Sequence, residues 1–290
     1  MTALQVEDAV VEYKVPGRPA VRAVAGVSLH VEAGEVLGLV GESGCGKSSL
    51  GRAIVGLNPL DSGRILVEGR AIAPLGRRAR PVADRAVQMV FQDPYSSLNP
   101  RRRVGRQIQD AVPGPGGAAR VRELLESVGL PGAAAERFPH QFSGGQRQRI
   151  AIARALASEP RVIVADEPVS ALDASTRLQV AGLLSETSAS RGVALLMISH
   201  DLSGLRVIAD RIAVMYFGRI VEMGPTDAVW TEPRHPYTRA LIGAIPRLGR
   251  DAPMPSEPGR SAPVVVSDDD ARLVECAPGH LVAAEALVVS

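Results

Sequence analysis

A short apolar run leads directly into a glycine-rich loop, and this junction constrains the chain more than any other feature. Val36–Val40 is apolar apart from one glycine, which is typical of a buried strand. Gly41–Ser48 follows it with the pattern G-x-x-x-x-G-K-S. Glycines let the backbone turn tightly around a phosphate, and a helix from about Lys47 to Val55 would point its N-terminus at that anion. The junction therefore predicts a strand–loop–helix unit that grips a nucleotide phosphate.

Two acidic residues at the end of another apolar run supply the chemistry that such a loop needs. Asp166 and Glu167 follow Val162–Ala165. An aspartate at the end of a buried strand can hold Mg²⁺, and a neighbouring glutamate can act as a general base on water. In the loop, Lys47 is expected to neutralise the β- and γ-phosphates, and Ser48 to offer its hydroxyl to Mg²⁺. The combination predicts triphosphate hydrolysis.

Strand and helix patterns alternate along the chain, which indicates an α/β fold. From Asp93 to Pro160 the pattern becomes helical, so this segment is interpreted as a helical subdomain inserted into the α/β core. The remaining expectations are a helix over 175–191, a strand over 193–198, a hairpin over 212–223 that turns at Gly218-Arg219, and a linker over 247–261. The last thirty residues are expected to form a small strand-rich appendage or to be loosely ordered.

Charge and cysteine content exclude several classes of protein. The 290 residues include 33 basic and 31 acidic side chains, a net charge of +2, which is too balanced for a nucleic-acid footprint. The clusters Arg77–Arg80 and Arg101–Arg103 are short and are interpreted first as solvated loops, with contact sites for an acidic partner as the alternative. Two distant cysteines, Cys45 and Cys276, make neither a disulfide framework nor a metal site, which favours a reducing compartment. Because the charge is balanced, we expect no nucleic-acid partner.

No segment has the length or composition of a membrane anchor. Met1–Tyr13 carries acidic residues and lacks a basic leader, so it is not interpreted as a signal peptide. No apolar run approaches the roughly 20 residues that a membrane helix needs. A role at a membrane would therefore have to come through a partner.

A second glycine-rich turn narrows the class of nucleotide hydrolase. Ser143 stands before Gly144, Gly145 and Gln146, and the residues that follow have a helical pattern. Ser143 is therefore a candidate N-cap, and the turn can face a phosphate. Together with the phosphate loop and the acidic pair at Asp166, this turn resembles the signature sequence of the ATP-binding cassette (ABC) family.

The resemblance implies a fold and a division of the chain. It implies a P-loop NTPase core with a RecA-like mixed sheet, an N-terminal antiparallel β subdomain, the inserted helical subdomain and a short C-terminal extension. Residues 1–246 would form the nucleotide-binding domain. Residues 247–290 would form a linker and tail, with the motif His235–Pro246 at the junction.

The resemblance also assigns roles to individual residues. Gln92 resembles the family's Q-loop glutamine, Ser170–Asp173 its D-loop, and His200 its switch histidine, so the implied catalytic residues are Glu167, His200 and Gln92. Mg²⁺ would be held by Ser48, Gln92 and Asp166. ATP would be held in one subunit by Tyr13, stacked on adenine, and by Gly41, Glu42, Ser43, Gly44, Cys45, Gly46, Lys47, Ser48 and Ser49, and in the other subunit by Ser143, Gly144, Gly145 and Gln146.

Two further stretches resemble one subfamily, the ATPases of oligopeptide, dipeptide and nickel importers. The first is Phe91–Arg101, which follows the Q-loop, and the second is His235–Leu241, followed by Ile245-Pro246. His235-Pro236 should break the chain and begin a short helix over 237–245 that packs on the core, a structural role. Members of this subfamily often carry several cysteines in the tail; here the tail holds only Cys276, so no iron–sulfur or zinc site is expected there.

The implied assembly is larger than one chain. A second ABC ATPase subunit, identical or paralogous, would pair with this one, and two transmembrane permease subunits would bind the pair at the cytoplasmic face of the inner membrane. An extracytoplasmic solute-binding protein would act indirectly. The alternative is a cassette ATPase of DNA repair or translation, which usually carries two cassettes or a long coiled-coil insertion; neither is visible in this sequence.

Overall fold

The structure is a computed structural model that describes residues 1–14, 16–17, 19–72, 74–75, 85–93, 97–114, 117–245 and 272–287. The expected linker over 247–261 and the cluster Arg77–Arg80 lie outside these residues. Within them, no helix combines the length and hydrophobicity that a bilayer span requires.

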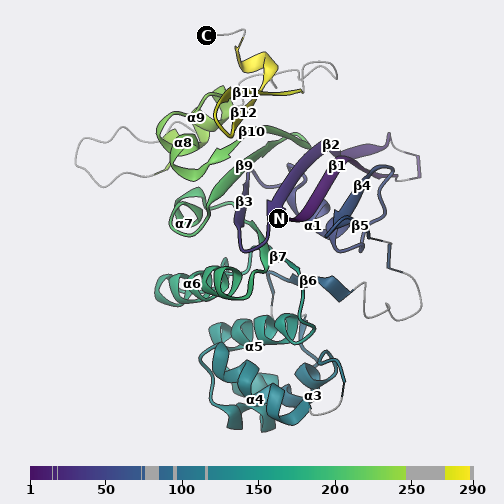
Figure 1. The fold of residues 1–290 in the computed structure, drawn as a ribbon, viewed down its shortest axis with the longest axis vertical. Helices are drawn as coiled ribbons and strands as arrows, with labels where there is room; N and C mark the ends of the chain where they lie inside the picture. The colour runs from purple at the N-terminus through teal and green to yellow at the C-terminus, as the bar shows by residue number, and fades with distance from the viewer. Residues whose placement is uncertain are drawn as a thin grey trace, which may run out of the picture.

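A mixed eight-stranded sheet forms the centre of the molecule (Figure 1). Its strand order is β11-β12-β10-β9-β3-β8-β7-β6, and the five strands from β9 to β6 are parallel. Every residue of β3, β7 and β8 is buried, which explains why their sequences are continuous apolar runs. The strands are β3 (Val36–Val40), β6 (Val87–Val90), β7 (Val162–Asp166), β8 (Ala194–Ile198), β9 (Arg211–Tyr216), β10 (Arg219–Pro225), β11 (Leu273–Ala277) and β12 (His280–Ala283).

An antiparallel sheet of four strands, in the order β2-β1-β4-β5, covers one face of the centre. Its strands are β1 (Thr2–Tyr13), β2 (Val21–Glu32), β4 (Ser62–Val67) and β5 (Arg70–Ala71). Helix α1 (Lys47–Ile54) shares an apolar core with both sheets, since Leu50 and Ile54 cluster with Leu4 of β1 and Leu37 of β3. The expected α/β fold with an N-terminal antiparallel subdomain is confirmed.

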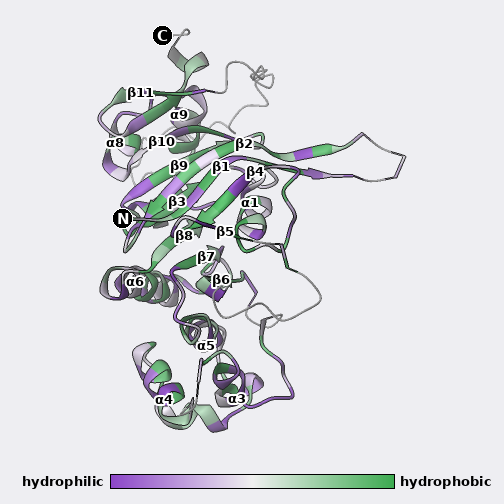
Figure 2. Cartoon of the chain, turned by 45° about the vertical axis from the view of Figure 1, so that its right-hand side comes forward, coloured by the Kyte–Doolittle hydropathy of each residue, from purple (hydrophilic) through white to green (hydrophobic). Residues whose placement is uncertain are grey.

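Helices make up the lower part of the molecule in Figure 1, as expected for the segment after Asp93. Helices α3 (Val104–Gln109), α4 (Gly117–Ser127) and α5 (Gly144–Leu156) bury Ile108, Leu124 and Ile150 in one cluster that continues onto the sheet. Figure 2 shows hydrophobic and hydrophilic residues alternating along α4, the pattern of a helix with one buried face.

In the part of the chain that the structure describes, four more α-helices follow β7: α6 (Ala174–Arg191), α7 (Leu202–Arg206), α8 (Thr226–Thr231) and α9 (Pro236–Gly243). The hairpin of β9 and β10 turns one residue earlier than predicted. Tyr216 pairs with Arg219, so the two turn residues are Phe217 and Gly218, both with positive φ. The sequence prediction took the glycine as the first turn residue, whereas such tight turns place a left-handed conformation at both central positions.

The C-terminal strands join the central sheet rather than forming a separate unit. β12 pairs antiparallel with β10, and β11 pairs with β12, so the described part of the tail extends the sheet at its β10 edge. This outcome matches the strand-rich alternative for the described tail residues. The division of the chain at residue 246 stays a prediction.

Candidate functional site

The phosphate loop connects β3 to α1, and its lysine is held inside it. The Lys47 side chain is buried, and its Nζ donates to the Gly41 and Glu42 carbonyl oxygens at 2.7 and 2.8 Å. Gly46 needs to be glycine because its φ is 110° and an added Cβ would lie 2.0 Å from the Ala23 carbonyl oxygen. These contacts hold the loop in one defined conformation.

Strand β2 and the end of β9 enclose this loop. The Gly218 N–H donates to the Cys45 carbonyl at 2.9 Å, and Ala25 N–H donates to the Gly218 carbonyl at 2.8 Å. Burial raises the pKa of the Cys45 thiol, and both cysteines of the chain are free. Cys45 therefore lies in the loop as a neutral thiol rather than in a disulfide.

A serine–aspartate pair lies where α1 meets β7. The Ser48 hydroxyl donates to Asp166 Oδ1 at 2.9 Å. Asp166 ends β7, and its burial raises the pKa of the carboxyl group. A buried carboxylate with this environment favours a cation beside it, and hydroxyl and carboxylate oxygens are ligands that suit Mg²⁺.

Glu167 follows directly and is held between two of the predicted catalytic side chains. Its backbone is strained, with φ of 46°, and its N–H donates to the Ile198 carbonyl at the end of β8. One carboxylate oxygen lies 3.2 Å from His200 Nδ1, and the other accepts from Gln92 Nε2 at 3.0 Å. Gln92, which follows β6, and His200, which follows β8, thus converge on the carboxylate that follows β7.

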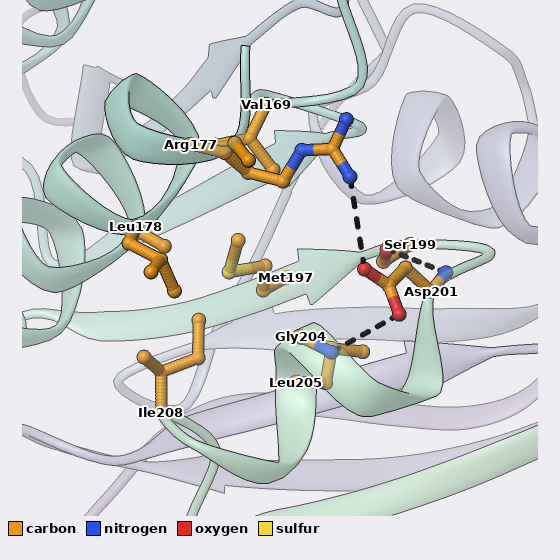
Figure 3. Close-up of a pocket in the computed structure, with 11 residues that line it drawn as sticks. Val169, Arg177, Leu178, Met197, Ser199, Asp201, Gly204, Leu205 and Ile208 are labelled. Atoms are coloured by element: carbon orange, nitrogen blue, oxygen red, sulfur yellow. Dashed lines mark hydrogen bonds and ion pairs between the residues drawn. The ribbon is translucent and has the colours of Figure 1, made fainter. Parts of the chain in front are cut away.

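The loop that carries His200 is fixed by its neighbours while the imidazole is exposed. Asp201 N–H donates to the Ser199 hydroxyl at 2.9 Å, and the Asp201 carboxylate accepts from Gly204 N–H at 3.1 Å, capping α7. Figure 3 shows these bonds at the edge of a mostly apolar cavity of about 230 Å³ between α6 and α7, beside Arg177. The backbone on both sides of His200 is therefore held, and the side chain can reach outward.

Tyr13 lies at the end of β1, next to the start of α1. Its hydroxyl is 3.1 Å from Ser49 Oγ and accepts from Asn58 Nδ2 at 2.8 Å. Tyr13 is 40% exposed, so part of the residue is accessible to a ligand. Ser49 and Tyr13, which the sequence assigned to nucleotide binding, are thus brought together beside the loop.

The signature turn begins α5, away from the phosphate loop. Ser143 is the N-cap, with Oγ accepting from Gln146 N–H at 3.3 Å, and Gln146 Oε1 accepting from Ser143 N–H at 3.0 Å. The predicted N-cap is confirmed, and it is a reciprocal capping box. Figure 1 shows α5 well below α1, with β7 and β6 between them. One chain therefore gathers the loop, Asp166, Glu167, His200 and Gln92, but leaves Ser143 to Gln146 apart from them.

One contact to the loop was missed in the sequence. The Glu42 N–H donates to the Tyr237 hydroxyl at 2.9 Å, across 195 positions of the chain. The sequence predicted Tyr237 only as part of a helix that packs on the core. Tyr237 does lie in that helix and in the core cluster. No local pattern indicates this contact, because it depends on where α9 docks.

Comparisons with known proteins agree with this geometry. Residues 24–170 match the family model "ABC transporter", and residues 221–267 match "Oligopeptide/dipeptide transporter, C-terminal region". The oligopeptide transport ATP-binding protein OppF of Bacillus subtilis is 48% identical over 245 residues, which cover 81% of this chain and 80% of OppF.

Two further matches extend the comparison. The glutathione import ATP-binding protein GsiA of Escherichia coli is 48% identical over 257 residues, or 86% of this chain but 40% of GsiA. Among solved structures, a dimeric ATP-binding cassette in a post-hydrolysis state with ADP and Pi matches with a TM-score of 0.68 and 27% identity, over 77% of this chain and 98% of that one. The chain therefore belongs to the ABC transporter family of ATPases, in the branch that carries the oligopeptide/dipeptide transporter C-terminal region.

Proposed function

We propose that this chain is the ATP-binding, ATP-hydrolysing subunit of an ABC importer for dipeptides, oligopeptides or a related solute such as nickel. The support is the joint match of residues 24–170 and 221–267 and the relative named as an oligopeptide transport protein. The rival function, a cassette ATPase of DNA repair or translation, is not favoured, since the match over 221–267 is to a transporter region.

The observation that carries the proposal is the position of the Glu167 carboxylate. It lies at the end of β7, one residue after Asp166, and is held by Gln92 and His200. A carboxylate fixed in this way can orient a water and accept its proton as that water attacks the γ-phosphorus. In this mechanism His200 contacts the γ-phosphate, and Lys47 leaves its two carbonyl partners to neutralise the phosphate charge.

The site suits ATP with Mg²⁺. Ser48, Asp166 and Gln92 offer a hydroxyl, a carboxylate and an amide oxygen, and Ser48 and Asp166 are already within hydrogen-bond distance. Bound Mg²⁺ would offset the negative charge that develops on the phosphate oxygens. Tyr13 and Ser49 lie beside the loop at the side where the adenine is expected.

A complete site needs a second subunit. Ser143, Gly144, Gly145 and Gln146 lie at the start of α5, apart from the phosphate loop of the same chain; Ser143 and Gln146 are exposed there, and Gly145 is buried. They would close over the ATP held by a partner subunit, identical or paralogous, as two cassettes pair head to tail. The related cassette solved with ADP and Pi was itself a dimer, which supports this arrangement.

Coupling to transport would run through the region around Gln92. A helix from each of two transmembrane permease subunits is expected to dock near Gln92 and the segment 93–103, which places the chain at the cytoplasmic face of the inner membrane. An extracytoplasmic solute-binding protein would deliver the solute to those permeases. Closure of the ATPase dimer on ATP would move them, and hydrolysis would reopen it.

The decisive experiment is Glu167→Gln, which removes the base but keeps the phosphate loop intact. Steady-state ATP hydrolysis by the chain assembled with its partner ATPase subunit should fall by about 100-fold or more, because the proton acceptor is lost. Equilibrium binding of ATP should persist. Glu186→Gln, which changes an exposed carboxylate of α6, is the matched control and should hydrolyse ATP normally. Near-normal turnover in Glu167→Gln would exclude the assigned mechanism.

A further inference from the structure

The C-terminal helix α9 contributes a side chain to the phosphate loop. The Tyr237 hydroxyl accepts the Glu42 N–H at 2.9 Å, and Tyr237 is 9% exposed. The Glu42 carbonyl of the same residue accepts from Lys47 Nζ at 2.8 Å. Glu42 is therefore fixed at both of its backbone polar groups, on one side by α9 and on the other by the lysine that is expected to meet the phosphates.

The tyrosine ring is held firmly enough to fix the loop. It packs on the Tyr216 ring with centroids 4.2 Å apart, and Tyr216 ends β9 just before the turn whose Gly218 N–H binds the Cys45 carbonyl. Burial raises the pKa of the Tyr237 hydroxyl, so it stays neutral and accepts the Glu42 N–H across the physiological pH range. Because this acceptor is both rigid and neutral, we expect it to hold the phosphate loop in one conformation.

A buried carboxylate on β10 fixes the start of α9. Glu222 is fully buried, and its two oxygens accept the N–H groups of Arg234 and His235 at 2.8 and 2.9 Å. His235 in turn caps the helix, because its Nδ1 accepts the Tyr237 N–H at 3.1 Å. The position of Tyr237 therefore depends on Glu222.

The same carboxylate also binds the C-terminal strand. His280 of β12 is 2% exposed, and its Nε2 lies 2.7 Å from Glu222 Oε1. An added Cβ on Gly224 of β10 would lie 3.0 Å from the His280 ring, so this ring is closely packed against the strand. A polar path thus runs from the C-terminal strand through Glu222 and the α9 N-terminus to the phosphate loop.

We propose that Tyr237 is a positioning residue for the phosphate loop, and that His280 and Glu222 couple the C-terminal strand to ATP affinity through it. The proposal rests on the proposed function and adds a positioning residue to its ATP site. The Tyr237 ring fills space in the core, and its hydroxyl in addition binds the backbone of the phosphate loop. The C-terminal region would then tune how well the loop is preorganised for the phosphates.

The first test compares two single-atom deletions in neighbouring rings. Tyr237→Phe removes the acceptor of the Glu42 N–H and keeps the ring, and should raise the Kd for ATP roughly three- to tenfold, the equivalent of one lost hydrogen bond. The KM for ATP should rise by a larger factor than kcat falls. Tyr216→Phe is the control, since no hydrogen bond from the Tyr216 hydroxyl is found among the described residues.

Failure of the positioning role can be distinguished from failure of the proposed function. If wild-type chain binds ATP and Tyr237→Phe binds it equally well, the positioning role is overturned. Equal weakening by Tyr216→Phe would also overturn it, because the effect would then belong to ring packing. Absence of ATP binding in the wild-type chain would instead refute the proposed function.

The second test asks whether the C-terminal strand acts through Tyr237. His280→Leu removes the ring nitrogen that meets Glu222 at similar side-chain volume. It should weaken ATP binding severalfold in the wild-type chain and much less in a Tyr237→Phe background, since coupled residues are not additive. Equal weakening in both backgrounds, or none in either, would overturn the coupling, and thermal unfolding verifies that each variant is folded.

Discussion

Gly145 lies where the signature helix α5 contacts the start of α6. A side chain added at this position should lower the stability of the fold by a measurable amount. A Cβ added there would lie 2.3 Å from Thr176 Cγ2, but 3.6 Å from Thr176 Cβ. Thr176 is anchored, because its N–H donates to the Asp173 carboxylate at 3.0 Å as α6 begins. Gly144, one residue earlier, has only Leu172 Cδ2 near such an atom, at an ordinary 3.7 Å.

These distances set the size of the effect. Gly145→Ala forces atoms into a contact that real structures avoid, and overpacking of this kind costs about 1–3 kcal/mol. Alanine also gains up to about 1 kcal/mol over glycine in a helix. Gly144→Ala should make that gain without the clash. The difference between the two variants therefore isolates the contact with Thr176, and we expect Gly145→Ala to be the less stable by about 2 kcal/mol.

The assay is thermal unfolding of both variants and of a double variant. A difference of about 2 kcal/mol corresponds to about 6 °C in Tm for a chain of this size. Thr176→Ser deletes only the Cγ2 methyl group, so it should restore most of the stability that Gly145→Ala loses. Equal Tm values for Gly145→Ala and Gly144→Ala, or no recovery with Thr176→Ser, would refute the steric argument.

Two further predictions concern charge and the subunit interface. Burial raises the pKa of Asp166 in the folded chain, so its contribution to stability is present at low pH and is lost as pH rises through that pKa. Asp166→Asn, neutral throughout, should therefore raise the Tm of the nucleotide-free chain at neutral pH, by a margin that shrinks as the pH is lowered. Ser143→Arg should block ATP-driven pairing and hydrolysis yet spare nucleotide binding, and Ser143→Ala controls for the lost helix cap; normal hydrolysis by Ser143→Arg would argue against a two-chain site.

Features encoded by neighbouring residues were predictable from the sequence. The phosphate loop depends on glycines beside a buried strand, and the N-cap at Ser143 depends on a hydroxyl three residues before Gln146. The placement of Asp166 follows from its position at the end of an apolar run. The carboxyl ends of parallel strands form the edge of the sheet where ligands bind, and Asp166 is the last residue of β7. Each of these depends on contacts within a few positions of the chain.

Features that depend on docking were not predictable. Glu222 is an acidic residue in an apolar strand, and nothing nearby in sequence shows that Arg234, His235 and His280 will satisfy it. The Tyr237 contact with Glu42 spans 195 positions. Such contacts appear only when the sheet edge, the helix and the tail are placed in space. The hairpin turn at Phe217 was misplaced for a different reason, since a non-glycine residue there adopts positive φ.

The segment from Glu167 to Thr176 joins the two halves of the proposed mechanism within one chain. At its start, the Ser170 hydroxyl donates to the Glu167 carbonyl and accepts from Gln92 Nε2 at 3.2 Å. At its end, Thr176 meets Gly145 of the signature helix. In the proposed dimer Glu167 acts on one ATP, whereas the signature closes over the other. Because Thr176 contacts Gly145, we expect a shift of this segment at one ATP to reach the turn that covers the second, so that the two sites hydrolyse ATP in a coupled way rather than independently.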